Sequence, residues 1–290
     1  AAHLVIVNHA LLMSDLTAGR ALIPDYDVLI VDEAQHLEEE ATRHLGFELG
    51  QRSFDDHLQL LGGDRGLLNR VEASLRASSA ADTRRTTVEE VAARMTSLLP
   101  AVRESLAGMF ALLGGLIDQI ADEDPRAEQQ TRITSATRAQ PAWSQLEVQW
   151  ESVDVSLAQL RKELDALSSA LEGLDQADVT DYEGLMIETA DTLQRNTELR
   201  QRLAEFIPQP QPDGIYWVDR APHTGDFTLY SAPIHVGEKL EELLFGQKES
   251  VVLTGATLSA KGTFEHIRER TGFGDAEEVL VGSPFDYKRA

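Results

Sequence analysis

Short runs of apolar residues stand near both ends of the chain. The runs are rich in β-branched and aromatic residues and lie at 4–7, 28–31, 215–218, 227–230 and 251–254. Continuous apolar runs of this length are typical of strands buried on both faces, as in a parallel sheet. Between the last two runs, the pattern predicts a helix with three leucines on its buried face. This helix covers residues 236–245, with Leu240, Leu243 and Leu244 facing the core. The two ends therefore predict an α/β domain.

The middle of the chain follows a different period. Apolar residues recur there at spacings of three and four: Trp143, Leu146, Trp150, Val153, Leu157, Leu160, Leu164, Leu167, Leu171 and Leu174. This 3.5-residue period predicts a long helix that packs lengthwise against partners. Residues 88–120 repeat the pattern and residues 185–206 continue it more loosely. We expect an elongated all-α bundle of antiparallel neighbours, inserted within the α/β domain. Such rows of leucines ordinarily form a helical spacer without chemistry of its own.

Composition limits the classes of function. The 290 residues suffice for about two domains and carry a net charge of −23, which disfavours nonspecific nucleic-acid binding. The absence of cysteine excludes disulfides, thiolate zinc sites and cysteine-bound iron–sulfur clusters within these residues. The uncharged apolar stretch 105–117 apart from Glu-free flanks is too short to span a membrane. We expect a cytoplasmic protein without membrane association and, since it begins at Ala1, a piece of a longer chain.

Two adjacent carboxylates follow the apolar run 28–31. Asp32 and Glu33 would emerge at the carboxyl end of a strand, where open α/β sheets bind ligands. In nucleotide hydrolases, one acid at such a place associates with Mg²⁺ and the next polarises the attacking water. The alternative is structural, because Asp32 is also a good N-cap for an acidic helix.

A second run, 251–254, ends in small and hydroxyl residues. Thr254, Gly255 and Thr257 would let another backbone approach closely and offer hydroxyl groups at the same edge of the sheet. Taken alone, this pattern also fits an ordinary strand-to-helix turn.

Four arginines are candidates for contacts with phosphate groups. Arg84 and Arg85 stand beside threonines, and Arg132 and Arg138 lie in a second loop-like stretch. Surface arginines are more often simply solvated. The eight histidines are scattered and form no compact metal-ligand pattern.

Together, the two strand-end motifs resemble motifs II and III of superfamily 2 helicases. The stretch 5–12, the Asp-Glu-Ala-Gln box and its continuation 36–42, residues 231–236, and residues 282–287 narrow this to the DinG/XPD-like DNA helicases. The resemblance covers about 100 residues by motif and the middle of the chain by architecture. It implies an incomplete RecA-like parallel sheet with a large Arch-like helical-bundle insertion.

The resemblance also implies roles for individual residues. Asp32 would be the Mg²⁺-associated acid and Glu33 the group that activates water, while Gln35, Thr254 and Thr257 would couple the nucleotide site to DNA. Two positions depart from the family pattern: Gln35 stands where His is usual, and Gly255 stands where the coupling motif usually has Ser. The implied ligands are ATP with Mg²⁺ and single-stranded or forked DNA, with 5′-to-3′ translocation.

The resemblance gives expected boundaries for the parts of the chain. Motor domain 1 would comprise residues 1–36 and 213–283, with the insertion at 37–212 and the start of a connection to motor domain 2 at 284–290. The chain contains no GxxxxGK[ST] phosphate loop, so we expect the fragment alone to be inactive. Any cysteines that bind an iron–sulfur cluster would lie upstream. The alternative function is a non-enzymatic DNA- or protein-binding scaffold on a degenerate ATPase.

Overall fold

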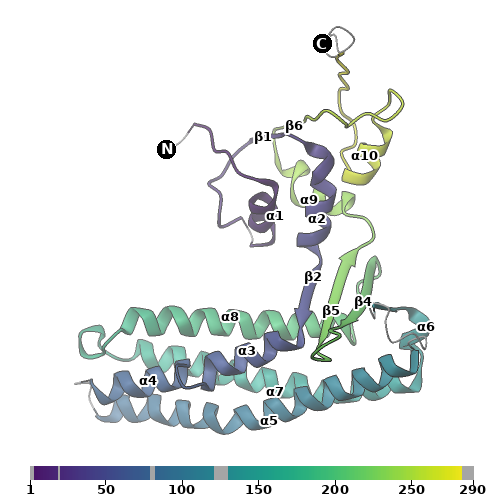
Figure 1. The fold of residues 1–290 in the computed structure, drawn as a ribbon. Coiled ribbons are helices and arrows are strands. Elements are labelled where there is room, and N and C mark those ends of the chain that lie inside the picture. The colour runs from purple at the N-terminus through teal and green to yellow at the C-terminus, as the bar shows by residue number, and fades with distance from the viewer. Residues whose placement is uncertain (1–2, 19, 79–81, 121–129, 283–290) are drawn as a thin grey trace. The chain divides into compact units, whose positions relative to one another are not determined.

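The chain forms two compact units, which are described separately. The computed structural model describes residues 3–18, 20–78, 82–120 and 130–282. The terminal unit comprises residues 1–47, 213–215 and 232–290, and the helical unit comprises residues 48–212 and 216–231. The chain passes from one unit to the other within strands β2 (Phe47–Gly50), β4 (Gly214–Arg220) and β5 (Phe227–Pro233) (Figure 1).

The terminal unit is built on a two-stranded parallel sheet. Strand β1 (Val28–Val31) pairs with β6 (Ser250–Leu253) in a register that places Val31 beside Leu253. Helices surround the sheet: α1 (His9–Thr17), η1 (Ala34–His36), α2 (Leu37–Leu45), α9 (Gly237–Leu243), η3 (Phe245–Gln247) and α10 (Glu265–Thr271). The core contains Leu29 and Val31 from β1 and Leu240 and Leu244 from the α9 segment. The predicted strands at 28–31 and 251–254 and the helix near 240 are therefore confirmed.

Two details of the terminal unit differ from the prediction. The predicted strand at 4–7 is wrong, because these residues form irregular backbone and pair with no strand in the described part of the chain. Leu4 and Ile6 are 76% and 87% exposed, so their apolar character has no buried surface to meet. Leu243 is 37% exposed rather than buried, because the helix ends there and the chain turns into η3.

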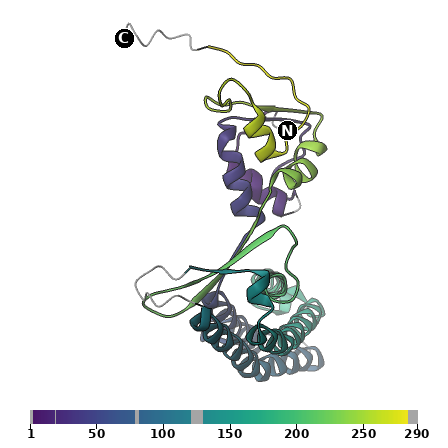
Figure 2. The same ribbon diagram turned by 90° about the vertical axis from the view of Figure 1, so that its right-hand side faces the viewer.

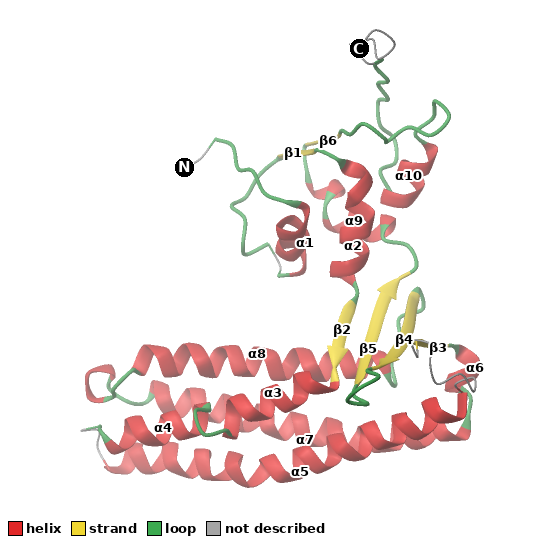
Figure 3. Ribbon diagram, in the orientation of Figure 1, coloured by secondary structure: helices red, strands yellow, loops and turns green. Residues whose placement is uncertain are grey.

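Long helices make up most of the helical unit (Figure 3). Their bounds are α3 (Gln51–Gly62), α4 (Leu67–Arg76), α5 (Asp82–Ile120), α6 (Ser135–Arg138), α7 (Pro141–Glu172), η2 (Gln176–Asp178) and α8 (Tyr182–Phe206). Helix α7 packs along α5 on one side and α8 on the other, while α3 and α4 pack against α5 and α8. Figure 2 shows these helices from a direction close to their axes. The predicted helical bundle is thus confirmed.

The apolar row of α7 forms the centre of this bundle. Its members from Trp143 to Leu171 are at most 6% exposed. Helix α5 buries a matching row that includes Met95 and Leu106. By length and composition α5 is also apolar enough to cross a membrane, but a core helix of a bundle passes the same test. Burial of its apolar face against α7 accounts for its composition.

Helix α8 contributes polar residues to the same core. Thr189, Thr192 and Asn196 are buried where the apolar row becomes loose. Each threonine hydroxyl donates to the carbonyl four residues earlier, and Asn196 donates to the carbonyl of Leu157 at 3.0 Å. These bonds satisfy buried polar groups that a simple apolar row would not contain.

A second sheet has the strand order β2-β5-β4-β3 and includes β3 (Gln130–Ile133), which pairs antiparallel with β4. The apolar runs at 215–218 and 227–230 are strands as predicted, but they belong to this sheet and not to the parallel one. Residues 216–231 consequently fall in the helical unit, whereas α2 falls in the terminal unit because Leu37 and Ala41 are buried in its core. The compact units therefore divide the chain at positions other than the expected 36/37 and 212/213.

Candidate functional site

Two adjacent acids, which we call the acid pair, end strand β1. Asp32 and Glu33 are exposed, whereas Val31 before them and Ala34 after them are buried. The backbone of Glu33 is left-handed, with φ of 51°. This conformation is uncommon for a residue with a Cβ, and such strain gathers at functional sites. It lets the Glu33 N–H donate to Asp32 Oδ1 at 3.0 Å. The acid pair is therefore held in a fixed turn at the end of the strand.

Gln35 lies against the acid pair. Its Nε2 donates a hydrogen bond to Glu33 Oε2. Its other amide atom, Oε1, is buried and has no hydrogen-bond partner within the described residues. The amide therefore orients one carboxylate of the acid pair through a charge-assisted bond.

The second predicted motif follows the neighbouring strand. The Thr254 N–H donates to the Val31 carbonyl at 2.8 Å, and the Ala34 N–H donates to the Thr254 carbonyl at 3.0 Å. Thr254 and Thr257 are exposed. A Cβ built on Gly255 would lie 2.5 Å from Gln35 Oε1. The structure thus brings the two motifs together, and it places the two positions that depart from the family pattern, Gln35 and Gly255, in contact.

A histidine on helix α1 touches the same turn and was not among the predicted site residues. His9 Nε2 donates to the carbonyl of Asp32 at 2.9 Å. The helix begins beside it, where the Asn8 side chain accepts from the Leu11 N–H at 2.9 Å. An Asn-His pair at a helix start was visible in the sequence, but nothing local indicated that the ring would contact a residue 23 positions away.

The four candidate arginines belong to the helical unit and are not gathered into one cluster by their elements. Arg84 and Arg85 lie in the first turn of α5, so their predicted loop-like setting is wrong. The segment is helical because it continues into the buried row of α5. Arg85 pairs with Glu89 at 2.7 Å. Arg132 is exposed on β3.

Arg138 is the most enclosed of these arginines. Its guanidinium lies 4.5 Å from the ring centre of Trp143 and 5.1 Å from that of Tyr216, and it donates to the Ile207 carbonyl at 2.9 Å. Burial lowers the pKa of this guanidinium. Cation–π contacts of this kind stabilise a local core, so the geometry favours a structural role for Arg138 over a contact with phosphate.

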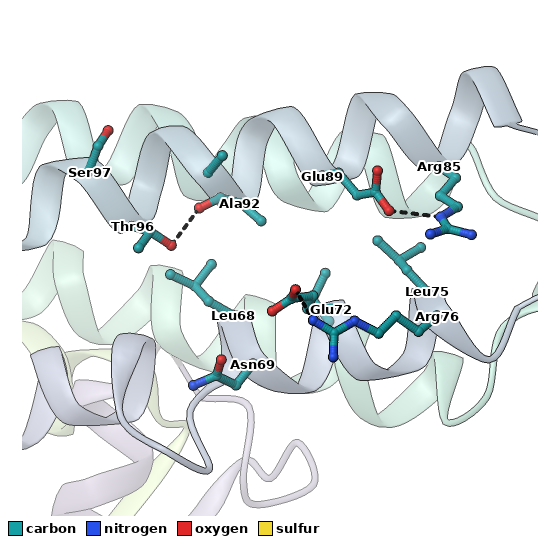
Figure 4. Close-up of a pocket in the computed structure, with 12 residues that line it drawn as sticks. Leu68, Asn69, Glu72, Leu75, Arg76, Arg85, Glu89, Ala92, Thr96 and Ser97 are labelled. Carbon is teal, nitrogen blue, oxygen red and sulfur yellow. Dashed lines mark hydrogen bonds and ion pairs between the residues drawn. The ribbon is translucent and has the colours of Figure 1, made fainter.

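A groove of about 680 Å³ runs between helices α4 and α5, apart from the acid pair (Figure 4). Leu68, Leu75 and Ala92 form part of its lining, and two ion pairs within helices, Arg76 with Glu72 and Arg85 with Glu89, flank it. Its charges are mutually compensated, so the groove shows no chemistry that would select an anion or a cation.

No group of three or more His, Cys, Asp or Glu side chains that could hold a metal ion occurs in the described part of the chain. The acid pair alone is therefore not a closed metal site. It suits an ion whose remaining ligands come from substrate phosphates and water, which is how Mg²⁺ is ordinarily bound.

The strand-end acid pair, facing a second motif across a parallel ladder, has the arrangement found in nucleotide-dependent enzymes, and sequence comparison specifies the class. No protein-family model matches the chain. Over nearly its whole length the chain is similar to bacterial DNA helicases of the DinG and YoaA type, so the resemblance inferred from the motifs is confirmed.

Three relatives show the extent of this similarity. The chain is 28% identical to the ATP-dependent DNA helicase YoaA of Escherichia coli over 99% of its length and 24% identical to the ATP-dependent DNA helicase DinG of Photobacterium profundum over 99%. It is 25% identical over 98% of its length to the 3′-5′ exonuclease DinG of Bacillus subtilis. The chain spans 30–40% of the length of these relatives.

Proposed function

We propose that the chain is part of an ATP-dependent DNA helicase, in which the acid pair hydrolyses ATP and the hydrolysis drives movement along single-stranded DNA in the 5′-to-3′ direction. The observation that carries the proposal is the direct backbone pairing of the two motifs, Val31 with Thr254 and Ala34 with Thr254. Similarity to DNA helicases over 98–99% of the chain supports it.

The terminal unit would be part of a RecA-like motor domain, and the helical unit would be the Arch-like insertion. The exposed face of the parallel sheet supports this assignment. Val28 and Ile30 are 59% and 66% exposed on β1, and Val252 is 47% exposed beside them on β6. A parallel sheet is normally covered on both faces, so we propose that further parts of the motor domain cover these side chains.

The donor set of the acid pair fits Mg²⁺ bound together with ATP. Asp32 is exposed and has given only Oδ1 to the Glu33 N–H, which leaves its second oxygen for the hydration shell of the ion. When bound, Mg²⁺ would neutralise charge on the phosphate oxygens. The residues Thr254, Gly255 and Thr257 would then transmit changes at this place to the DNA-binding parts of the protein.

Glu33 would act on the attacking water. Because Oε2 already accepts from Gln35, Oε1 is the atom left to accept the proton. As the water oxygen bonds to the γ-phosphorus, its O–H bond breaks towards Glu33 Oε1. The bond between the γ-phosphorus and the bridging oxygen breaks, and ADP leaves with the electron pair.

The test replaces this carboxylate in the full-length protein. Glu33→Gln should lower ATP turnover stimulated by single-stranded DNA by about 100-fold or more, because the amide cannot accept the proton. Nucleotide affinity, measured with a fluorescent ATP analogue, should remain close to that of the unchanged protein. Glu39→Gln is the matched control, because Glu39 is an exposed carboxylate on α2 that pairs with Arg43.

Near-normal turnover by the Glu33→Gln protein would contradict the assigned role of Glu33. Absence of any DNA-stimulated turnover in the unchanged full-length protein would favour the alternative, a binding scaffold on a degenerate ATPase.

A further inference from the structure

We propose that Gln35 is a positioning residue for Glu33, and that the absence of a side chain at Gly255 provides the space in which the Gln35 amide lies. The inference rests on the proposed function, in which Glu33 accepts a proton from water. It adds to that function a specific dependence of Glu33 on a residue of the neighbouring strand end.

The first observation is the bond between the two side chains. Glu33 is exposed and would otherwise exchange among several rotamers. The hydrogen bond from Gln35 Nε2 to Glu33 Oε2 restricts it. Gln35 touches no reacting atom in this arrangement, so its contribution would be to hold the carboxylate in one orientation.

The second observation is the space above Gly255. A Cβ at this position would lie 2.5 Å from Gln35 Oε1 and 3.3 Å from the Leu258 side chain. The first distance is closer than carbon and oxygen atoms approach without a bond, so something must move. Leu258 is buried in the core of the terminal unit, whereas the amide is the far end of a flexible side chain. The amide is therefore the group that would yield.

The backbone cannot relieve this contact easily. The bonds of Thr254 to Val31 and of Ala34 to Thr254 fix the two chain segments on either side of it. Widening the gap would break a continuous parallel ladder that starts at Val28 and Ser250. A methyl group at position 255 should consequently displace the amide and draw Nε2 away from Glu33.

The third observation is the carbonyl end of the amide. Gln35 Oε1 is buried without a hydrogen-bond partner among the described residues, which is an unfavourable state for an acceptor. No bond at that end therefore holds the amide against Gly255. The Nε2 bond to Glu33 and the fit over Gly255 keep it in place, so loss of that fit should release it.

A spectroscopic experiment tests the contact in the chain itself. The side-chain amide protons of Gln35 are assigned in the ¹⁵N-labelled protein by their loss in Gln35→Met. We expect Gly255→Ala to move these signals towards the positions of solvated glutamines. Gly274→Ala is the matched control, because a Cβ there would meet nothing within 4 Å, and it should leave the signals in place.

A second variant keeps the spectroscopic test decisive if Gly255→Ala does not fold. Glu33→Gln removes the charged acceptor without adding volume near Gly255. It should also shift the Gln35 amide protons. Unchanged Gln35 signals in Gly255→Ala, or in Glu33→Gln, would overturn the proposal.

A kinetic experiment tests the positioning role in the full-length protein. Gln35→Met and Gly255→Ala should each lower kcat by about tenfold and leave KM for ATP nearly unchanged, because they misplace Glu33 without removing substrate contacts. The double variant should be no slower than either single variant, since both changes remove the same interaction.

The outcomes separate this inference from the proposed function. Losses that multiply in the double variant would show independent structural effects and overturn the positioning role. If the unchanged full-length protein hydrolyses no ATP, the proposed function fails and the catalytic half of this inference fails with it. The amide spectrum still decides whether Gly255 provides the space for Gln35.

Discussion

A buried histidine in the helical unit shows how burial controls a single side chain. His57 is 1% exposed, and its Nε2 donates to Asn196 Oδ1 at 3.2 Å. Burial, the largest cause, lowers its pKa to about 4; the bond to Asn196 raises it, and the nearby charge of Arg195 lowers it further. The folded protein therefore keeps this ring neutral over a range in which an unfolded chain binds a proton.

This difference predicts a pH dependence of stability. Because the folded pKa lies below the unfolded value near 6.5, the full contribution is present above pH 6.5 and is lost as the pH falls towards 4. Between pH 7.5 and pH 5, the loss should be about 2 kcal/mol in the free energy of unfolding of the helical unit. Urea titrations followed by circular dichroism measure it.

His57→Gln should remove most of this dependence, whereas His223→Gln, which changes an exposed histidine of the same unit, should leave it intact. An equal pH dependence in all three proteins would contradict the role of His57.

At the scale of single residues, sequence patterns identified the type of site better than its contacts. The acid pair and the threonine-glycine motif could be predicted, because each follows an apolar run that only a buried strand explains. The contact between Gln35 and Gly255 could not be predicted, since it depends on the register that places Val31 beside Leu253. The enclosure of Arg138 by Trp143 and Tyr216 likewise depends on residues from separate elements.

At the scale of elements, helix α7 is the clearest case in which the period of the sequence determines the structure. Its row of large apolar residues faces α5 on one side and α8 on the other. Leu160 is fully buried near the middle of this row, whereas Val155, on the same helix, is 64% exposed. The helix therefore offers a direct comparison between burial and intrinsic helix preference.

Leu160→Ala should destabilise the helical unit by about 2–5 kcal/mol, because it removes buried apolar contacts and leaves a cavity. Val155→Ala should change the free energy of unfolding by much less, since alanine has the higher helix propensity and little surface is lost. The midpoints of urea unfolding provide the comparison. Equal effects of the two changes would mean that the row on α7 is not the core of the bundle.

Strands were harder to predict than helices, for a physical reason. A helix satisfies its own backbone, so the periodic rows in α5 and α7 were sufficient to locate it. A strand needs a partner, and the run at 4–7 resembles the run at 28–31 in composition. Only the second pairs with another strand in the described part of the chain. For the same reason the pairing of β4 with β3 instead of the parallel sheet was not visible in either sequence segment.

At the scale of the whole molecule, net charge sets the conditions for contact with DNA. Residues 37–207 contain 17 basic and 31 acidic residues, which gives a net charge of −14. Such a surface repels phosphate groups at long range, and binding through it would depend on a few local cations. Arg84 and Arg85 in the first turn of α5 remain candidates for this role.

Replacing Arg84 and Arg85 with alanine in the full-length protein should weaken binding of single-stranded DNA. The slope of log affinity against log salt concentration should become smaller by about one unit, as two phosphate contacts are lost. Arg161 and Lys162, an adjacent and exposed pair on α7, provide the control and should not affect the slope when replaced. Equal changes from both pairs would indicate only a general effect of charge.

We also expect the 290-residue chain by itself not to hydrolyse ATP. It lacks a phosphate loop, so nothing in it binds the β- and γ-phosphates beside Asp32. Measured release of inorganic phosphate should equal that of a buffer blank, with and without single-stranded DNA. Turnover above the blank that disappears in Glu33→Gln would contradict this expectation.

The parallel ladder between β1 and β6 has a consequence for the order of folding. It joins Val31 to Leu253, which are 222 positions apart, and the entire helical unit lies between them. Contacts this distant in sequence form slowly, whereas neighbouring helices pack early. During synthesis, β1 leaves the ribosome long before its partner exists, so its exposed apolar residues must wait while the bundle folds. The acid pair consequently acquires its second motif only after nearly the whole chain has been made, and a truncated product cannot assemble the site.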